Sequence, residues 1–128
     1  MSLNDPIADA LSKINNAVKA LNKEVTVKRS KFMLAVLEVM KVNNYIGSFG
    51  IMEESPHEIK INLLGTINKC LAIKPRYPVK IEDLEKEEKR FLPAKDFGVL
   101  IISTNKGLLT QKQAKEENVG GTLIAYCY

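Results

Sequence analysis

The spacing of apolar residues along this chain of 128 residues changes at Tyr45, from the period of a helix to the period of a strand. Before that point, apolar stripes at helical spacing run through residues 7–21 and 33–40. After it, apolar and polar residues alternate as far as residue 64, with a turn at Pro56. Helices that precede paired strands favour an α+β fold in which the helices cover one face of a small sheet.

Local signals define the elements of the first half of the chain. Asp5 suits the N-cap of the first helix, and Pro6 suits its first helical position. Alternation at Val25–Lys28 predicts a short strand, and Ser30 then suits the N-cap of the second helix. Residues 1–64 are therefore predicted to form an α-β-α-β-β domain.

The second half is predicted to be a mainly β domain, residues 65–128, packed against the first and beginning at Gly65. Its charged run at residues 83–93 has no clean apolar stripe and is interpreted as an exposed, partly helical connection. The pattern Thr110-x-x-Gln113 predicts a capping box for one short helix that ends at Glu117. Strands are expected at residues 67–73, 79–81, 97–102 and 122–126.

Composition excludes several classes of protein. No apolar stretch is long enough to cross a bilayer, and the N-terminus lacks the basic-then-apolar order of an export signal, so a soluble, cytoplasmic protein is expected. Cys70 and Cys127 cannot form a zinc site with a single histidine, and we expect reduced thiols, no metal and no cofactor. The net charge of +4 and the pI near 9.0 make a nucleic-acid partner worth considering.

Catalytic arrangements are weak in this sequence. His57 follows a proline in a predicted turn, where a solvated histidine is much more common than a catalytic base. Cys70 lies in an apolar segment and is interpreted as a small core residue. The order of Ser103–Gly107 places the lysine before the glycine, which is the reverse of a phosphate-binding loop. We predict that the protein is not an enzyme. The alternative is a small hydrolase that uses His57 with Cys70 or with the nearby glutamates.

Two basic segments fit a binding surface. In Lys28-Arg29-Ser30-Lys31 a strand leads into a helix N-terminus, where free N–H groups and the helix dipole favour an anion. Taken alone, this segment is better explained as an ordinary capped helix start with exposed lysines. In Lys74–Pro78, two prolines hold Arg76 and Tyr77 outward, as a forked donor and a stacking face. A tyrosine that covers a sheet edge is an equally good interpretation.

A third group combines Ser103–Gly107 with the pair Gly120-Gly121. Hydroxyl and amide groups both donate and accept hydrogen bonds, and glycine allows close approach of the backbone, which suits the shallow groove of an RNA helix. A tight turn would use Asn and Gly, but it would leave Ser103, Thr104 and Lys106 without a role. No strand carries alternating aromatic residues, so a mostly helical RNA is a better target than single-stranded bases.

These residues also resemble those of a known protein family. The C-terminal segment FGVLIISTNKGLLTQKQAKEENVGGTLIAYCY resembles the signature of the universal small-subunit ribosomal protein numbered eight. The signature is an apolar strand, Ser-Thr-x-x-Gly, a hydrophobic pair, a Thr-capped helix, Gly-Gly and a closing strand. The segments NDPIADALSKINNA and IKPRYPV are also similar to segments of that family, so the resemblance spans nearly the whole chain.

The resemblance implies primary binding to the central domain of small-subunit ribosomal RNA, at an irregular helix with an internal loop. Such binding organises that region during subunit assembly. The main RNA contacts of the family fall here on Ser103, Thr104, Asn105, Lys106, Gly107, Gly120 and Gly121. Supporting contacts fall on Asp5, Pro6, Asn15, Lys28, Ser30 and Lys31, with Lys74, Arg76 and Tyr77 as further candidates.

The resemblance also implies the surroundings of the protein. Its expected partners are the RNA and neighbouring small-subunit ribosomal proteins, with no membrane, and it is expected to be a monomer outside the ribosome. Asn105, Thr122 and the acidic segment at residues 81–92 differ from the bacterial pattern and indicate the archaeal or eukaryotic branch, of which we favour the archaeal. The alternatives are an RNA-binding module outside the ribosome and a translational repressor of its own messenger RNA.

Overall fold

The computed structural model describes residues 6–73, 76–94 and 97–128 of the chain. The chain divides into two units, Met1–Leu71 and Ala72–Tyr128, each with its own sheet. The division falls inside the short strand β4 (Cys70–Ala72), and the boundary at Gly65 stays a prediction. Within the described ranges, no helix has the length and apolar character that a membrane span requires.

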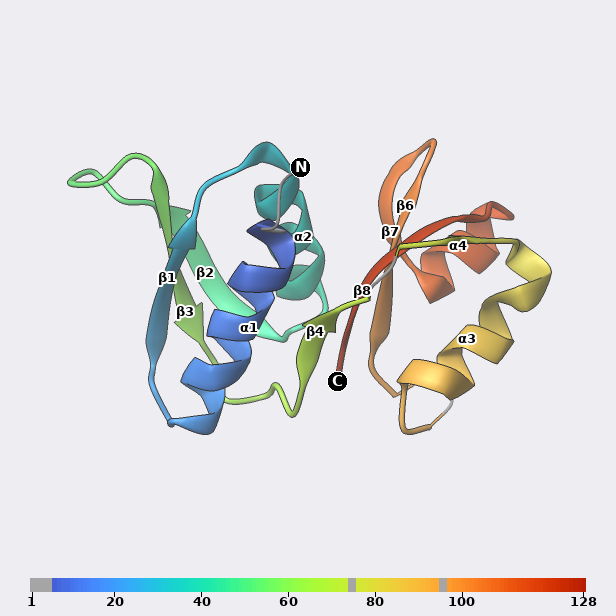
Figure 1. The fold of residues 1–128 in the computed structure, drawn as a ribbon, viewed down its shortest axis with the longest axis horizontal. Helices are drawn as coiled ribbons and strands as arrows, with labels where there is room; N and C mark the ends of the chain where they lie inside the picture. The colour runs from blue at the N-terminus through green and yellow to red at the C-terminus, as the bar shows by residue number, and fades with distance from the viewer. Residues whose placement is uncertain (1–5, 74–75, 95–96) are drawn as a thin grey trace. The chain divides into compact units, whose positions relative to one another are not determined.

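The first unit has the α-β-α-β-β order that the sequence predicts. Its elements are α1 (Pro6–Lys19), β1 (Glu24–Lys28), α2 (Lys31–Val42), β2 (Ile46–Ile51) and β3 (Glu58–Leu63). The three strands form an antiparallel sheet in the order β1-β3-β2. Both helices lie on the same face of this sheet (Figure 1).

Alternation in the strands and the helical stripes place most of the apolar residues of this unit in its interior. In β3, Ile59 and Ile61 are fully buried while the residues between and beside them reach solvent, as the two-residue period of a strand requires. The Ser30 hydroxyl accepts a hydrogen bond from the Met33 N–H at 3.0 Å, which confirms Ser30 as the N-cap of α2. Buried residues from the helices and β1 complete the core: Ile7, Leu11, Ile14, Val27, Met33, Leu37 and Met40.

In the part of it that the structure describes, the second unit contains five strands, two α-helices and a 3₁₀ helix at Ile81–Asp83. Besides β4, its elements are β5 (Pro78–Val79), α3 (Leu84–Phe91), β6 (Val99–Thr104), β7 (Gly107–Thr110), α4 (Gln111–Glu117) and β8 (Gly121–Cys127). The strand order is β4-β8-β6-β7, and β5 pairs with the start of β8. The capping box at α4 is confirmed, because the Thr110 hydroxyl and the Gln113 side chain each accept a backbone N–H of the other residue.

Two elements of the second unit differ from the prediction. Residues 107–110 form β7, the second strand of a hairpin with β6, where only a turn was expected. Residues 84–91 form a regular helix because Leu84 and Glu88, one turn apart, both face the interior. A glutamate on the inner face hides the apolar stripe of this helix in the sequence. Its charge is tolerated because Lys115 donates a hydrogen bond to its carboxylate.

Candidate nucleic-acid interface

The start of β8 is the point at which three polar segments of the second unit meet. Gly121 pairs with Val79 of β5, and Thr122 pairs with Ser103 of β6. The N–H of Leu123 donates a hydrogen bond to the Tyr77 carbonyl at 3.1 Å. The structure therefore brings together Arg76-Tyr77, Ser103–Gly107 and Gly120-Gly121, which are far apart in the sequence.

Gly120 and Gly121 are required by the close approach of neighbouring backbones. A Cβ atom on Gly121 would lie 2.2 Å from the carbonyl oxygen of Ser103, and one on Gly120 would lie 2.5 Å from that of Val79. No side chain fits at either position without a shift of the sheet. The pair thus has a structural role, and Gly120 is also exposed to solvent.

The hairpin between β6 and β7 uses Thr104 to hold its turn. The Thr104 hydroxyl accepts a hydrogen bond from the Lys106 N–H at 3.0 Å and donates one to the Gly107 carbonyl at 2.8 Å. Gly107 has a φ of 102°, a conformation that favours glycine. The interpretation that a turn leaves Thr104 without a role is therefore wrong.

Lys106 and Asn105 form the exposed tip of this hairpin. The ammonium group of Lys106 lies 2.9 Å from the Glu117 carboxylate, at the end of α4. Both side chains are about half exposed, and an ion pair in such a position contributes only about 0–1 kcal/mol. A phosphate could therefore replace Glu117 at little cost. Ser103 is half-buried on β6, beside the tip.

Tyr77 lies against the core of the second unit instead of standing free of it. Its hydroxyl donates a hydrogen bond to Glu87, and the Arg90 guanidinium lies 5.8 Å from the centre of its ring. Partial burial, followed by the hydrogen bond and the negative charge of Glu87, raises the pKa of Tyr77 above its ordinary value. These contacts agree with a tyrosine that covers the sheet, whereas the neighbouring Arg76 is exposed.

In the first unit, the segment from Lys28 to Lys31 is held by the end of the β2–β3 hairpin. The Arg29 N–H donates to the His57 carbonyl at 2.7 Å, and the Arg29 guanidinium donates to the Pro56 carbonyl at 3.2 Å. Lys28 and Lys31 are exposed on either side of this anchor. The lysines flank the N-terminus of α2, where the helix dipole adds positive potential.

Asn15 has a clear role inside the first unit. It is only 7% exposed, and its side-chain oxygen accepts a hydrogen bond from the Cys70 N–H at 3.3 Å. Its proposed contact with RNA gains no support from this position. Asp5 and Lys74 lie outside the described residues, as does the side chain of Pro6, with which α1 begins.

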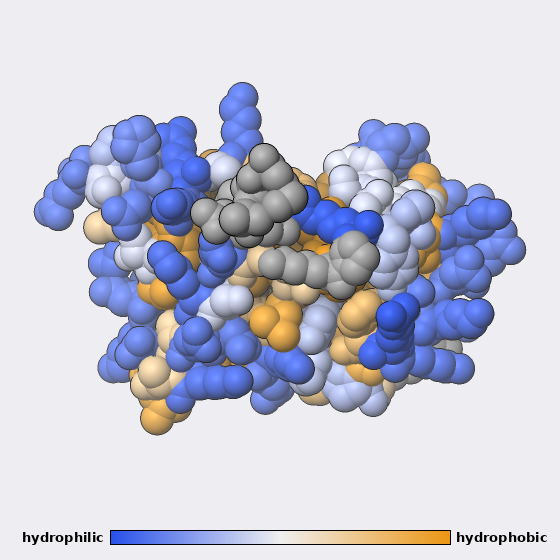
Figure 2. Space-filling view, viewed as in Figure 1, coloured by the Kyte–Doolittle hydropathy of each residue, from blue (hydrophilic) through white to orange (hydrophobic). Residues whose placement is uncertain are grey.

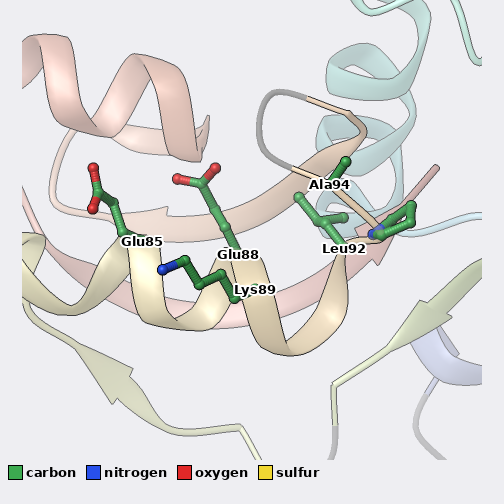
Figure 3. A pocket seen from close by; sticks show the side chains of 6 residues that line it. Glu85, Glu88, Lys89, Leu92 and Ala94 are labelled. Atoms are coloured by element: carbon green, nitrogen blue, oxygen red, sulfur yellow. The ribbon is translucent and has the colours of Figure 1, made fainter.

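A cavity of about 250 Å³ beside α3 was not foreseen from the sequence. Figure 3 shows the carboxylates of Glu85 and Glu88 extending from the same face of this helix. The lining is Glu85, Glu88, Lys89, Leu92, Pro93 and Ala94. Its mixture of opposite charges and apolar side chains, with Glu88 already bonded to Lys115, does not form a catalytic set.

The residues suggested for a hydrolase do not form a reactive pair. His57 is exposed in a turn, whereas Cys70 is fully buried and its thiol donates a hydrogen bond to the Leu11 carbonyl. Across the residues that the structure describes, no group of three or more His, Cys, Asp or Glu side chains could hold a metal ion.

Four α-helices and two antiparallel sheets, in the residues that the structure describes, define a small α+β protein. Residues 5–128 match the model of the family described as Ribosomal protein S8, and the chain belongs to that family. It is therefore a structural protein of the small ribosomal subunit, in the cytoplasm, and it binds ribosomal RNA beside other components of the subunit. The family is not enzymatic.

Proposed function

We propose that this chain binds the central domain of small-subunit ribosomal RNA, at an irregular helix with an internal loop. Binding there organises the region while the subunit assembles. Outside the ribosome the protein is a monomer that recognises the RNA before other proteins join. The segments around the start of β8 provide the main contact surface, and the lysines beside α2 support it.

The observation that carries the proposal is the convergence of the hairpin tip, Arg76 and Gly120-Gly121 around one strand end. Glycine backbone without side chains can approach a shallow groove closely. The Ser103 hydroxyl and the Asn105 amide beside it match the 2′-hydroxyls and base edges that the minor groove of an RNA helix presents. This combination reads the shape of a distorted helix better than it reads unpaired bases.

Cations of both units provide the attraction to phosphates and set the register. The exposed candidates are Lys28, Lys31, Arg76 and Lys106, with Lys74 proposed beyond the described residues. About four to six phosphate contacts give a plot of log affinity against log salt with a slope of roughly −3 to −5. A slope near zero in filter binding contradicts the proposal that these cations attract the phosphates.

Hydroxyl-radical footprinting of the purified protein on complete small-subunit ribosomal RNA tests the proposal. We expect protection confined to one irregular helix of the central domain. Protection elsewhere, or none at all, contradicts the proposal. As a control, the variant Lys13→Met should give the same footprint as the unsubstituted protein. Lys13 is an exposed lysine of α1 that lies outside the proposed contacts.

A further inference from the structure

Three helices of the protein end in the same hydrogen-bonded motif. At each end, the residue with a left-handed φ donates to the carbonyl three residues earlier, and the next residue donates to the carbonyl five residues earlier. The left-handed residues are Leu21 after α1, Asn44 after α2 and Asn118 after α4, with φ values of 62°, 64° and 57°. The backbone geometry is shared, so the choice of residue can be compared directly.

Leu21 breaks the rule that the other two helix ends follow. Asparagine tolerates the left-handed region, whereas the branched side chain of leucine is strained there. After α2 and α4 an apolar residue comes next, Tyr45 and Val119, and it is half-buried. After α1 the order is reversed, so that the polar Asn22 follows and Leu21 is 88% exposed. Within this chain the leucine gains no burial in exchange for its strain.

Leu21 lies on a larger apolar surface of the first unit, which we name the α1-end groove. The groove has a volume of about 560 Å³, and its lining includes Val18, Leu21, Lys23, Leu63, Leu64 and Ile67. Leu64 is 53% exposed. Apolar side chains reach the surface at the lower left of Figure 2, where α1 connects to β1 in Figure 1. Contiguous exposed apolar surface of this kind is typical of sites that bind another protein, a membrane or a ligand.

The charges around the α1-end groove indicate the chemistry of its occupant. Lys19 and Lys23, two residues before and after Leu21, are both exposed. The neighbouring carboxylate of Glu24 is engaged by Lys60 at 3.1 Å, so it does not neutralise these lysines. Phosphates would use the lysines but leave the leucines in water. A protein segment with an apolar side chain flanked by Asp or Glu uses both features.

We propose that the α1-end groove docks a neighbouring small-subunit ribosomal protein through a segment in which an apolar anchor is flanked by acidic residues. The proposal depends on the place of this chain in the small subunit, as the proposed function does. It concerns residues of the first unit other than the proposed RNA contacts, which are residues 28–31, 76–77, 103–107 and 120–121.

Photo-cross-linking in assembled small subunits identifies the occupant, with p-benzoylphenylalanine placed at position 22. We expect a cross-link to another ribosomal protein, at a peptide whose apolar residue has acidic neighbours. The same group at position 38, an exposed position of α2, serves as the control and does not give that peptide. A cross-link to ribosomal RNA, to a second copy of this chain or to nothing overturns the proposal.

A substitution at Leu21 separates docking from stability. Leu21→Asn copies the other two helix ends, so it raises the melting temperature of the isolated protein by about 3–5 °C. The same change weakens binding of a synthetic peptide with the cross-linked sequence by about tenfold or more. Lys23→Glu also weakens binding of this peptide, but it does not raise the melting temperature. Unchanged peptide binding by Leu21→Asn overturns the proposal.

Binding of the isolated chain to ribosomal RNA is measured in parallel, because it distinguishes the two proposals. Leu21→Asn leaves that affinity unchanged if the groove serves a protein. A parallel loss of RNA affinity in this variant overturns the docking proposal. Failure of the unsubstituted protein to bind the central domain contradicts the proposed function instead.

Discussion

Two segments of this protein carry similar polar residues but use them differently. In the first unit, Ser30 caps α2 and Arg29 holds the neighbouring hairpin, while Lys28 and Lys31 remain exposed. In the second unit, the hairpin at residues 103–107 uses its own residues for the turn and for an ion pair with α4. The first segment therefore presents exposed positive charges. The second presents a rigid hairpin whose lysine, Lys106, is already paired with Glu117.

The difference teaches how to separate folding roles from binding roles. A hydroxyl that completes a turn is a structural group even when it lies on the surface, because its hydrogen bonds are made within the chain. We therefore expect the first segment to contribute mainly attraction and salt dependence. The hairpin and the adjoining glycines contribute recognition, because their rigid backbone presents a defined surface. Four variants test this comparison.

The largest effect is expected for Gly121→Ala. The new Cβ atom would meet the Ser103 carbonyl oxygen at 2.2 Å, so β6 and β8 must separate at the point where the recognition surface is built. We expect a loss of about 2 kcal/mol or more in the free energy of unfolding, measured by urea denaturation. Gly50→Ala is the control, because nothing lies within 4 Å of its added carbon. Equal stability of the two variants contradicts the close approach.

Thr104→Val is expected to affect both the turn and the RNA. Loss of the hydroxyl removes two hydrogen bonds of the hairpin, which lowers the free energy of unfolding by about 0.5–1.5 kcal/mol. Affinity for the ribosomal RNA helix falls by about 1–3 kcal/mol in filter binding. Thr104→Ser keeps the hydroxyl and should restore most of both. Unaltered RNA binding by the valine variant removes the hairpin from the mechanism.

The double substitution Lys28→Met, Lys31→Met should change attraction without changing recognition. Each lost phosphate contact reduces the salt slope by about 1, so the slope becomes less negative by about 2. The ratio of affinities for the specific helix and for an unrelated RNA helix stays the same. A large fall in that ratio shows instead that the first unit takes part in recognition.

Glu117→Gln is expected to have the smallest effect. The substitution releases Lys106 from an exposed ion pair, so stability changes by less than about 1 kcal/mol. RNA affinity increases slightly at low salt, because Lys106 no longer has to leave the Glu117 carboxylate before it binds a phosphate. Weaker RNA binding contradicts the view that Glu117 merely holds the lysine until a phosphate replaces it.

Local chemistry was predictable from the sequence, whereas register was not. The caps at Ser30 and Thr110 depend on residues three positions apart, and both predictions are confirmed. The helix α3 was harder to predict because Glu88 occupies its inner face, and the partner that permits this, Lys115, lies in another helix.

The candidate site shows the same limit. The polar character of residues 103–107 and the glycine pair is visible in the sequence, but their meeting point depends on the pairing of β8 with β5 and β6. Burial of Asn15 is equally non-local, because its partner is the Cys70 backbone. The role of each proposed contact with RNA stays a prediction.

The central claim is that the start of β8 and the neighbouring hairpin tip contact folded RNA. Titration of isotope-labelled protein with a fragment of the central-domain helix, followed through backbone amide resonances, tests it most directly. We predict that the largest shifts occur at residues 104–107 and 120–122. The claim is contradicted if the amide resonances of these residues do not shift while resonances elsewhere in the protein do.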